Sequence, residues 1–219
     1  MCRQTGQRLT TREPDQVALP EDQMAEVPRV DMNATLRQAP LLRTLDDEAF
    51  SALTSSMGEV VLNRGAVLFH EGDSGDQLYV VIEGKIKLGR HAASGRETLH
   101  AVLGPGQMFG ELSLFDPGPR STTATAVTRC RLRVLEHSDL NPWLSGRPEV
   151  AMGLLGQLAA RLRRANDVVS DLVFSDVPGR VAKALLDLAN RFGERTDQGL
   201  VVRHELTQEE LARLVGASR

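Results

Sequence analysis

One segment of this chain gathers residue types suited to holding a phosphate group beside a sugar hydroxyl. It runs over residues 109–121 and reads FGELSLFDPGPRS. Gly110 lets the backbone approach a ligand where a Cβ would intrude, and Glu111 offers an acceptor for a ribose hydroxyl. Arg120 is a permanently charged fork that matches two phosphate oxygens, with the Ser121 hydroxyl beside it. These residues indicate recognition of a small cyclic phosphodiester that carries a ribose.

Two further features of the segment favour a ligand site over an ordinary surface turn. Residues from Leu112 to Phe115 can form a helical turn whose free N–H groups point at an anion. Pro117 and Pro119 stiffen the connection, so the arginine returns to the site at a modest entropic cost. A lone Gly-Glu pair would indicate only a turn, but all these parts in this order favour a site.

The elements that must position this segment are those of a small β-domain. Short runs of β-forming residues separated by Gly, Pro and Asp turn signals fill residues 60–136. The predicted strands are 60–62, 66–69, 78–82, 86–88, 98–103, 124–127 and 130–135. Regular short strands of this kind are typical of a jelly roll, so we predict an antiparallel β-roll. Short helices are expected around Leu36 and over residues 46–57.

After Pro148 the apolar period becomes helical, with no further proline before Pro178. Apolar residues then recur at alternating spacings of four and three, which is the seam of a coiled coil. They are Leu158, Leu162, Ala165, Val169 and Leu172. A helix packed on its own domain would need a broader stripe, so the pattern favours a long dimerisation helix and a twofold homodimer.

A second, smaller region begins at Asp176. One amphipathic helix is predicted from its apolar face and from Gly193 as its C-cap; the face consists of Val181, Leu185, Leu188 and Phe192. Residues 200–202 predict a short strand.

The last residues of the chain predict the first half of a helix-turn-helix. Thr207 is a good N-cap, and Glu210 completes a capping box. Gly216 stands where the tight turn belongs, and residues 217–219 would open the recognition helix. We therefore expect either a fragment of a longer protein or a natural truncation.

Three segments together resemble the cyclic AMP receptor protein (Crp/Fnr) family of bacterial transcription regulators, in its actinobacterial form. They are the FGELS…PRS cassette, FSDVPGRVA at 174–182 and LTQEELARLVGASR at 206–219. The similarity covers the chain from about Leu36 to its end. It implies an α+β protein with a cyclic-nucleotide-binding β-roll, a dimerisation helix and a winged helix-turn-helix that is C-terminally truncated. The expected divisions are a disordered tail (1–32), the β-roll (33–147), the dimerisation helix (148–175) and the incomplete DNA-binding domain (176–219).

The resemblance also implies the effector and its contacts. Cyclic AMP would be held by Gly110, Glu111, Leu112, Arg120 and Ser121, with Arg120 on the cyclic phosphate and Glu111 on the ribose 2′-hydroxyl. In the family, two polar residues of the long helix reach the adenine, one from each subunit, and these positions fall on Ala165 and Asn166. Ala165 replaces the usual threonine and loses a hydrogen bond of about 0.5–1.5 kcal/mol, whereas Asn166 can still donate or accept.

The implied partners are a palindromic DNA operator, a second copy of the chain and, as a further candidate, RNA polymerase. The candidate DNA contacts are Thr207, Gln208, Ser218 and Arg219. The alternative that stays open is a nucleotide-binding regulatory module that does not bind DNA itself, because most of the recognition helix is missing.

Composition limits the other classes of protein. The chain has 219 residues, 41% of them hydrophobic, and a net charge of −3, so any DNA contact must come from a local basic face. No apolar run approaches a membrane span and no secretory leader is recognisable, which predicts a cytoplasmic protein without membrane contact. Cys2 and Cys130 are too few for a disulfide framework and lie in no metal-ligand cluster.

An enzyme is not expected, because the sequence has no nucleophile elbow, Walker loop or dinucleotide fingerprint. A jelly-roll metalloenzyme would need clustered His and Glu ligands, so we expect no metal. The histidines are scattered at His70, His91, His100, His137 and His204. Three arginines of the long helix are predicted to form a solvated face, namely Arg161, Arg163 and Arg164. Trp143 is predicted to anchor the last helix of the roll.

Overall fold

The computed structural model describes residues 31–91, 97–112, 118–197 and 199–217. Residues 1–30 of the predicted tail lie outside the described residues. The side chain of Asp31 caps α1 (Met32–Leu36) by accepting from the backbone N–H of Asn33. Helix α2 (Asp47–Ser56) begins after Asp46, which accepts from the N–H of Ala49. Both short helices were predicted, and each begins at an aspartate because its carboxylate satisfies a free N–H of the first turn.

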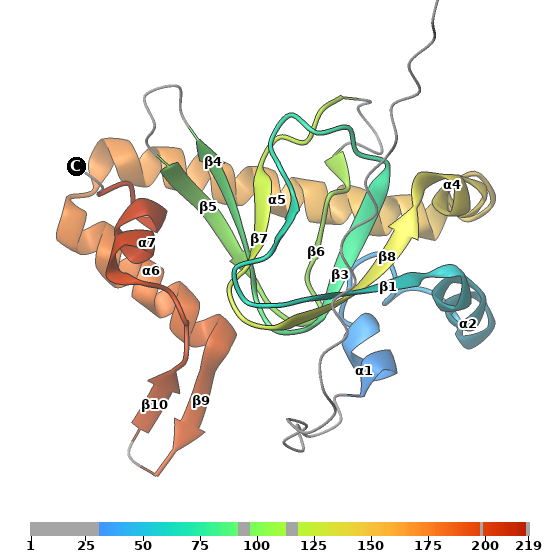
Figure 1. Ribbon diagram of the computed structural model, residues 1–219, viewed down its shortest axis with the longest axis horizontal. Coiled ribbons are helices and arrows are strands. Elements are labelled where there is room, and N and C mark those ends of the chain that lie inside the picture. Colours follow the sequence, from blue (N-terminus) through green and yellow to red (C-terminus); the bar gives the residue numbers. More distant parts are fainter. Residues whose placement is uncertain (1–30, 92–96, 113–117, 198, 218–219) are drawn as a thin grey trace, which may run out of the picture.

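Two antiparallel sheets form the β-roll (Figure 1), which confirms the predicted fold class. The strands are β1 (Gly58–Leu62), β2 (Val67–Phe69), β3 (Gln77–Glu83), β4 (Ile86–His91), β5 (Glu97–Leu103), β6 (Met108–Phe109), β7 (Thr123–Ala126) and β8 (Cys130–Glu136). Over the described residues, one sheet has the order β1-β8-β3-β6 and the other β2-β7-β4-β5. The two-residue strand β6, which the sequence did not predict, joins the edge of the first sheet by pairing with β3.

Two apolar clusters hold the roll together. One lies between the first sheet and the helices that flank it, and Trp143 packs against it as predicted. The other lies between the two sheets and includes Tyr79, Val81, Ile86 and Phe109. The alternating burial along β8 follows from its period of two, with one face on this inner cluster.

Two helices follow the roll. After α4 (His137–Gly146) the chain enters α5 (Pro148–Phe174), a 27-residue helix that runs behind the sheets in Figure 1. Its first turns are anchored by the buried Val150 and Leu154. Further along, the predicted seam is exposed, with Leu162 64% and Val169 61% accessible in the single chain. Most of this apolar stripe is therefore exposed in the single chain.

The C-terminal unit, as we call residues 176–217, contains two helices and a hairpin. They are α6 (Val177–Phe192), β9 (Gly193–Thr196), β10 (Gly199–Val202) and α7 (Gln208–Leu214). Asp176 caps α6 by accepting from the N–H of Gly179. Gly193 ends α6 as predicted, but its φ of −79° is extended rather than left-handed, because the residue begins β9. Strand β9 was not predicted.

The C-terminal unit rests on the outer side of the second sheet, where Figure 1 shows α7 beside β5. An apolar cluster at this contact joins Leu206 to Leu99, Val102 and Val127 of the roll. Lys87 on β4 forms an ion pair with Glu210 of α7. A cleft of about 270 Å³ remains between them, lined in part by these two residues.

Candidate functional site

Gly110 follows β6 directly and has a left-handed backbone with φ of +84°. A Cβ at this position would lie 2.8 Å from the carbonyl oxygen of Gln77 and 2.9 Å from Nη1 of Arg120. Both the conformation and the close approach therefore require glycine. This explains in physical terms why the cassette has a glycine between its strand and its acidic residue.

Arg120 is buried, with its side chain held from two directions. Its Nη1 donates to the carbonyl oxygens of Gln77 and Gly110, both at 3.0 Å. Its guanidinium carbon lies 4.4 Å from the centroid of the Phe69 ring. The Nε atom is buried and has no hydrogen-bond partner among the described residues. One side of the guanidinium is thus fixed to the protein, while Nε still lacks an acceptor.

An aromatic cluster that the sequence analysis missed forms the floor beneath this arginine. The rings of Tyr79 and Phe109 stack with centroids 5.3 Å apart, and Phe69 lies 5.9 Å from Tyr79. The Tyr79 hydroxyl donates to Oε1 of Gln77 at 2.6 Å. Burial raises the pKa of Tyr79, and the positive charge of Arg120 acts in the opposite direction.

Glu111 is completely buried and has two differently placed carboxylate oxygens. Oε1 forms an ion pair with Arg161 of α5, whereas Oε2 has no partner among the described residues. Burial raises the pKa of Glu111, and the charge of Arg161 opposes this shift. A buried acceptor without a donor is uncommon in native proteins, so Oε2 is suited to receive a hydroxyl from a ligand.

Arg161 was predicted to be part of a solvated helix face, and this prediction was wrong. Its Nη1 pairs with Glu111 and its Nη2 donates to the carbonyl of Met108 at 2.8 Å. The Glu111 carboxylate, which is buried and lies 50 residues earlier in the chain, holds this arginine against the roll. Helical periodicity carries no information about such a partner.

The remaining predicted ligand residues lie at the edge of this arrangement. Leu112 is helical and 47% exposed, but residues 113–117 of the expected helical turn lie outside the described residues. Ser121 follows Arg120 and is exposed. Ala165 lies one turn after Arg161 on the same face of α5, and both Ala165 and Asn166 are exposed in the single chain.

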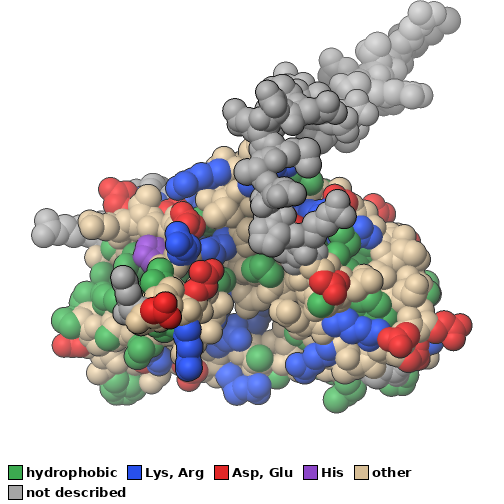
Figure 2. Space-filling model, turned by 90° about the horizontal axis from the view of Figure 1, so that it is seen from below, with side chains coloured by type: hydrophobic (Ala, Val, Ile, Leu, Met, Phe, Trp, Pro, Cys, Tyr) green, Lys and Arg blue, Asp and Glu red, His purple; other side chains and the backbone are tan. Residues whose placement is uncertain are grey.

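The predicted capping box at the start of α7 is present. The Thr207 hydroxyl accepts from the N–H of Glu210, and the Glu210 carboxylate accepts from the N–H of Thr207. Thr207 and Gln208 are exposed, and Gly216 has the positive φ of 66° that a tight turn requires. Ser218 and Arg219 lie outside the described residues. Figure 2 shows basic and acidic side chains interspersed on the face that it views.

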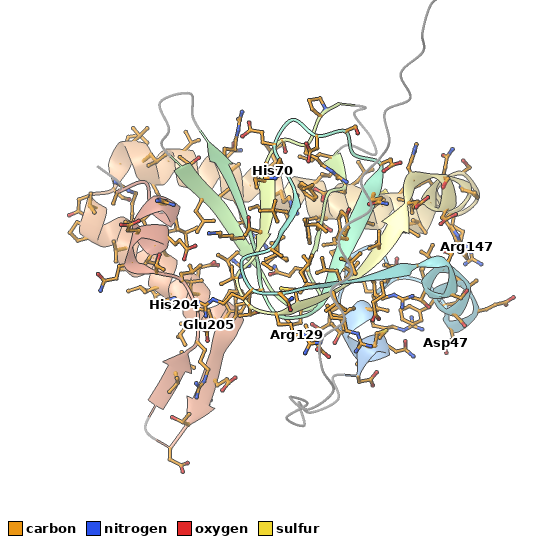
Figure 3. The ribbon with its side chains drawn as sticks, in the orientation of Figure 1. Asp47, His70, Arg129, Arg147, His204 and Glu205 are labelled. Atoms are coloured by element: carbon orange, nitrogen blue, oxygen red, sulfur yellow. The ribbon has the colours of Figure 1, made fainter. Side chains whose placement is uncertain are left out.

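The described part of the chain lacks both a metal-ligand cluster and a membrane-spanning helix. Within it, no three His, Cys, Asp or Glu side chains gather into a possible metal site. Figure 3 shows His70 and His204 on different parts of the molecule. None of the described helices is long and apolar enough to cross a bilayer.

Comparison with known proteins shows similarity to bacterial regulators. The cyclic nucleotide-binding domain family matches residues 59–146. The chain is 50% identical, over 86% of its length, to 84% of the CRP-like cAMP-activated global transcriptional regulator of Mycobacterium tuberculosis. The catabolite activator protein of Thermus thermophilus is 35% identical at a TM-score of 0.57, over 82% of this chain and 81% of that one. The c-di-GMP-responsive regulator CLP of Xanthomonas campestris is 26% identical at a TM-score of 0.68, over 79% and 86%.

Proposed function

The chain belongs to the cyclic AMP receptor protein (Crp) family, and on this premise we propose that it is a cyclic-AMP-responsive transcription regulator. The observation that carries the proposal is a pair of buried charged residues beside Gly110: Glu111 follows it in the chain, and Arg120 donates to its carbonyl. Arg120 has a buried donor without an acceptor, and Glu111 has a buried acceptor without a donor. A cyclic phosphate and a ribose hydroxyl would supply the two missing partners.

Each residue has a distinct role in this proposal. Arg120 binds the cyclic phosphate through Nε while Nη1 stays on the carbonyls of Gln77 and Gly110. Glu111 accepts the ribose 2′-hydroxyl through Oε2, with Arg161 holding the other oxygen. Gly110, Leu112 and Ser121 complete the cradle around the phosphate.

The base is read at the long helix. Ala165 and Asn166 lie beyond Arg161 on α5, where a second copy of the chain would bring its own α5 against the exposed seam. Asn166 can hydrogen-bond the adenine, whereas the Ala165 methyl cannot. We therefore expect that the phosphate and ribose provide most of the affinity and that selectivity among purine bases is modest.

The output follows by a shift in population between two arrangements of the dimer. A nucleotide that binds one arrangement more tightly favours it, to the extent of its difference in affinity. The hinge for this movement is the segment from Phe174 to Gly179, where α5 ends and α6 begins. The two C-terminal units would then meet the two halves of a palindromic operator, in a protein located in the cytoplasm.

The first test is a calorimetric titration of the protein with cyclic AMP and cyclic GMP, with Arg120→Ala as the site variant. Loss of hydrogen bonds to a charged group predicts a drop in cyclic AMP affinity of about 100-fold. Arg131→Ala, on the surface of β8, is the control and should bind as the wild type does. Unchanged affinity in Arg120→Ala would mean that the cassette is wrongly assigned.

The second test concerns DNA. The protein should bind a palindromic duplex more tightly when cyclic AMP is present, measured at a fixed salt concentration because phosphate contacts are salt-dependent. Equal affinity with and without the nucleotide would exclude ligand gating and leave the nucleotide site itself in place.

A further inference from the structure

The cassette is joined to the surface of the roll by a very short strand. Strand β6 has two residues, Met108 and Phe109, whose side chains are 1% and 0% exposed. It pairs with β3, and the pairing continues outward where the N–H of Val81 donates to the carbonyl of Gln107 at 2.9 Å. Gln107 is only three residues from Gly110 in the chain, and the two residues of β6 between them are paired and buried.

The C-terminal unit contacts the turn at the outer end of this strand. Nη2 of Arg191, in the last turn of α6, donates to Oε1 of Gln107 at 2.8 Å and also to the carbonyl of Val102. The same Gln107 oxygen accepts from the N–H of Gly104 at 3.0 Å. One side-chain oxygen thus joins α6 to the turn formed by residues 104–107.

Phe192 packs on the same turn. A Cβ at Gly104 would lie 2.5 Å from Cε1 of the Phe192 ring, so the aromatic side chain lies directly against the turn backbone. Arg191 is itself oriented from the other side by Asp187, 3.0 Å from its Nη1. The contact between α6 and the turn therefore has a fixed polar part and an apolar part.

The other polar contacts of the C-terminal unit reach the roll elsewhere. Lys87 pairs with Glu210 from within β4, and Lys85 donates to the carbonyl of Arg203. Neither Lys87 nor Lys85 belongs to the turn or to β6. Lys85 also lies over the Phe192 ring, 5.3 Å from its centroid, so Lys87 is the suitable control.

We propose that Arg191 couples the C-terminal unit to the nucleotide site through Gln107 and β6, by a route within one chain that bypasses the dimer seam. A displacement of Gly110 or Glu111 cannot be absorbed along β6, because both of its side chains are tightly packed. The displacement therefore moves Gln107, and through the contact of Gln107 with Arg191 it moves α6. Arg191 is a positioning residue in this scheme and does not touch the ligand. This inference rests on the proposed function.

The route makes a reciprocal prediction. If the Arg191–Gln107 contact differs in strength between two arrangements of the protein, its removal changes the affinity for a nucleotide that prefers one of them. Arg191→Ala should therefore change the dissociation constant for cyclic AMP about fivefold or more, although the residue lies outside the pocket. Lys87→Ala should leave it within about twofold.

A double-mutant cycle separates this coupling from a general loosening of the fold. Gln107→Leu removes the side-chain acceptor on the roll and leaves the Val102 carbonyl in place. The double variant Arg191→Ala/Gln107→Leu should therefore shift the affinity by less than the sum of the two single variants. Arg191→Lys keeps the charge but offers a single nitrogen, so it should recover part of the effect. Amide hydrogen exchange over residues 104–109 should be faster in Arg191→Ala and unchanged in Lys87→Ala.

The outcomes are distinct from those of the proposed function. If the wild type binds cyclic AMP and Arg191→Ala binds it equally well, the coupling route is overturned while the sensor remains. The same holds if Lys87→Ala shifts the affinity as much as Arg191→Ala, or if the two mutations of the cycle simply add. If the wild type itself does not bind cyclic AMP, the proposed function fails, and this inference fails with it.

Discussion

Glu111 and Arg161 form an ion pair across 50 residues of sequence, in which the carboxylate is completely buried and the arginine side chain is 30% exposed. The pair joins the cassette of the roll to the middle of the long helix. The helix therefore contributes directly to the site in which the ribose is proposed to bind, and the first two of the five predictions below depend on this pair.

Glu111→Gln should weaken cyclic AMP binding by about tenfold, because a hydrogen bond to a neutral amide is weaker than one to a carboxylate. The variant keeps the shape of the side chain, so the fold should persist. Calorimetry measures the affinity, with Glu59→Gln on the surface of β1 as the control. Equal affinity in the wild type and Glu111→Gln would remove Glu111 from the ribose contact.

The wild type and Glu111→Gln should also differ in how their stability depends on pH. Burial raises the pKa of Glu111 in the folded protein above its ordinary 4.5. At a pH between 4.5 and this raised pKa, the folded protein holds a proton on Glu111 that the unfolded chain has lost. The stability of the wild type relative to Glu111→Gln should therefore fall as pH rises through the raised pKa. Urea unfolding at several pH values checks this, and an opposite slope would show that Arg161 dominates over burial.

Gly110→Ala should destabilise the protein more than Gly65→Ala does. The two glycines have nearly the same φ, +84° and +82°, so the conformational cost of about 1–2 kcal/mol is shared. Only at Gly110 would the new Cβ meet other atoms, and nothing lies within 4 Å of it at Gly65. The difference between the two unfolding free energies isolates the close approach, and similar values would contradict it.

Ala165→Thr should strengthen cyclic AMP binding by about three- to tenfold, the value of one added hydrogen bond to a neutral group. Ala159→Thr, also exposed on α5, carries the same helix-propensity cost and is the matched control. A gain in affinity for cyclic AMP without a gain for cyclic GMP would locate Ala165 at the adenine amine. No gain for either nucleotide would place Ala165 away from the base.

Leu162→Glu should convert a dimer into monomers, because it places a charge in the proposed seam. Its side chain is already 64% exposed in the single chain, so the monomer should lose little stability. Leu186→Glu changes an equally exposed leucine, 65% accessible on α6, and should leave the dimer intact. Sedimentation analysis decides, and a monomeric wild type would disprove the seam.

Most of the fold follows from local patterns in the sequence. Alternating apolar residues between turn signals predict the longer strands, and the aspartate and threonine caps predict where α2, α6 and α7 begin. Strand β6 is too short to show a period, and β9 reads GERT, which has no apolar alternation. Both strands exist because a neighbouring strand offers backbone partners, which is a property of tertiary structure.

The candidate site divides in the same way. Gly110, Glu111 and Arg120 are recognisable because they lie within eleven residues of one another. The pairing of Glu111 with Arg161 and the aromatic floor of Phe69, Tyr79 and Phe109 are not, because their members come from separate elements. Arg191 was likewise invisible to local analysis, since Gln107 lies 84 residues away.

Arg161 stands midway along α5, which extends from Pro148 to Phe174. The half before it is anchored by Val150 and Leu154, while the half after it carries the exposed seam and ends at Phe174. At about 1.5 Å per residue, the half after Arg161 is about 20 Å long. If this half of the helix tilted by about 5° with Arg161 as the pivot, Phe174 would move by roughly 2 Å. In the proposed mechanism, a small displacement at Glu111 would therefore become larger by the time it reaches the end of α5.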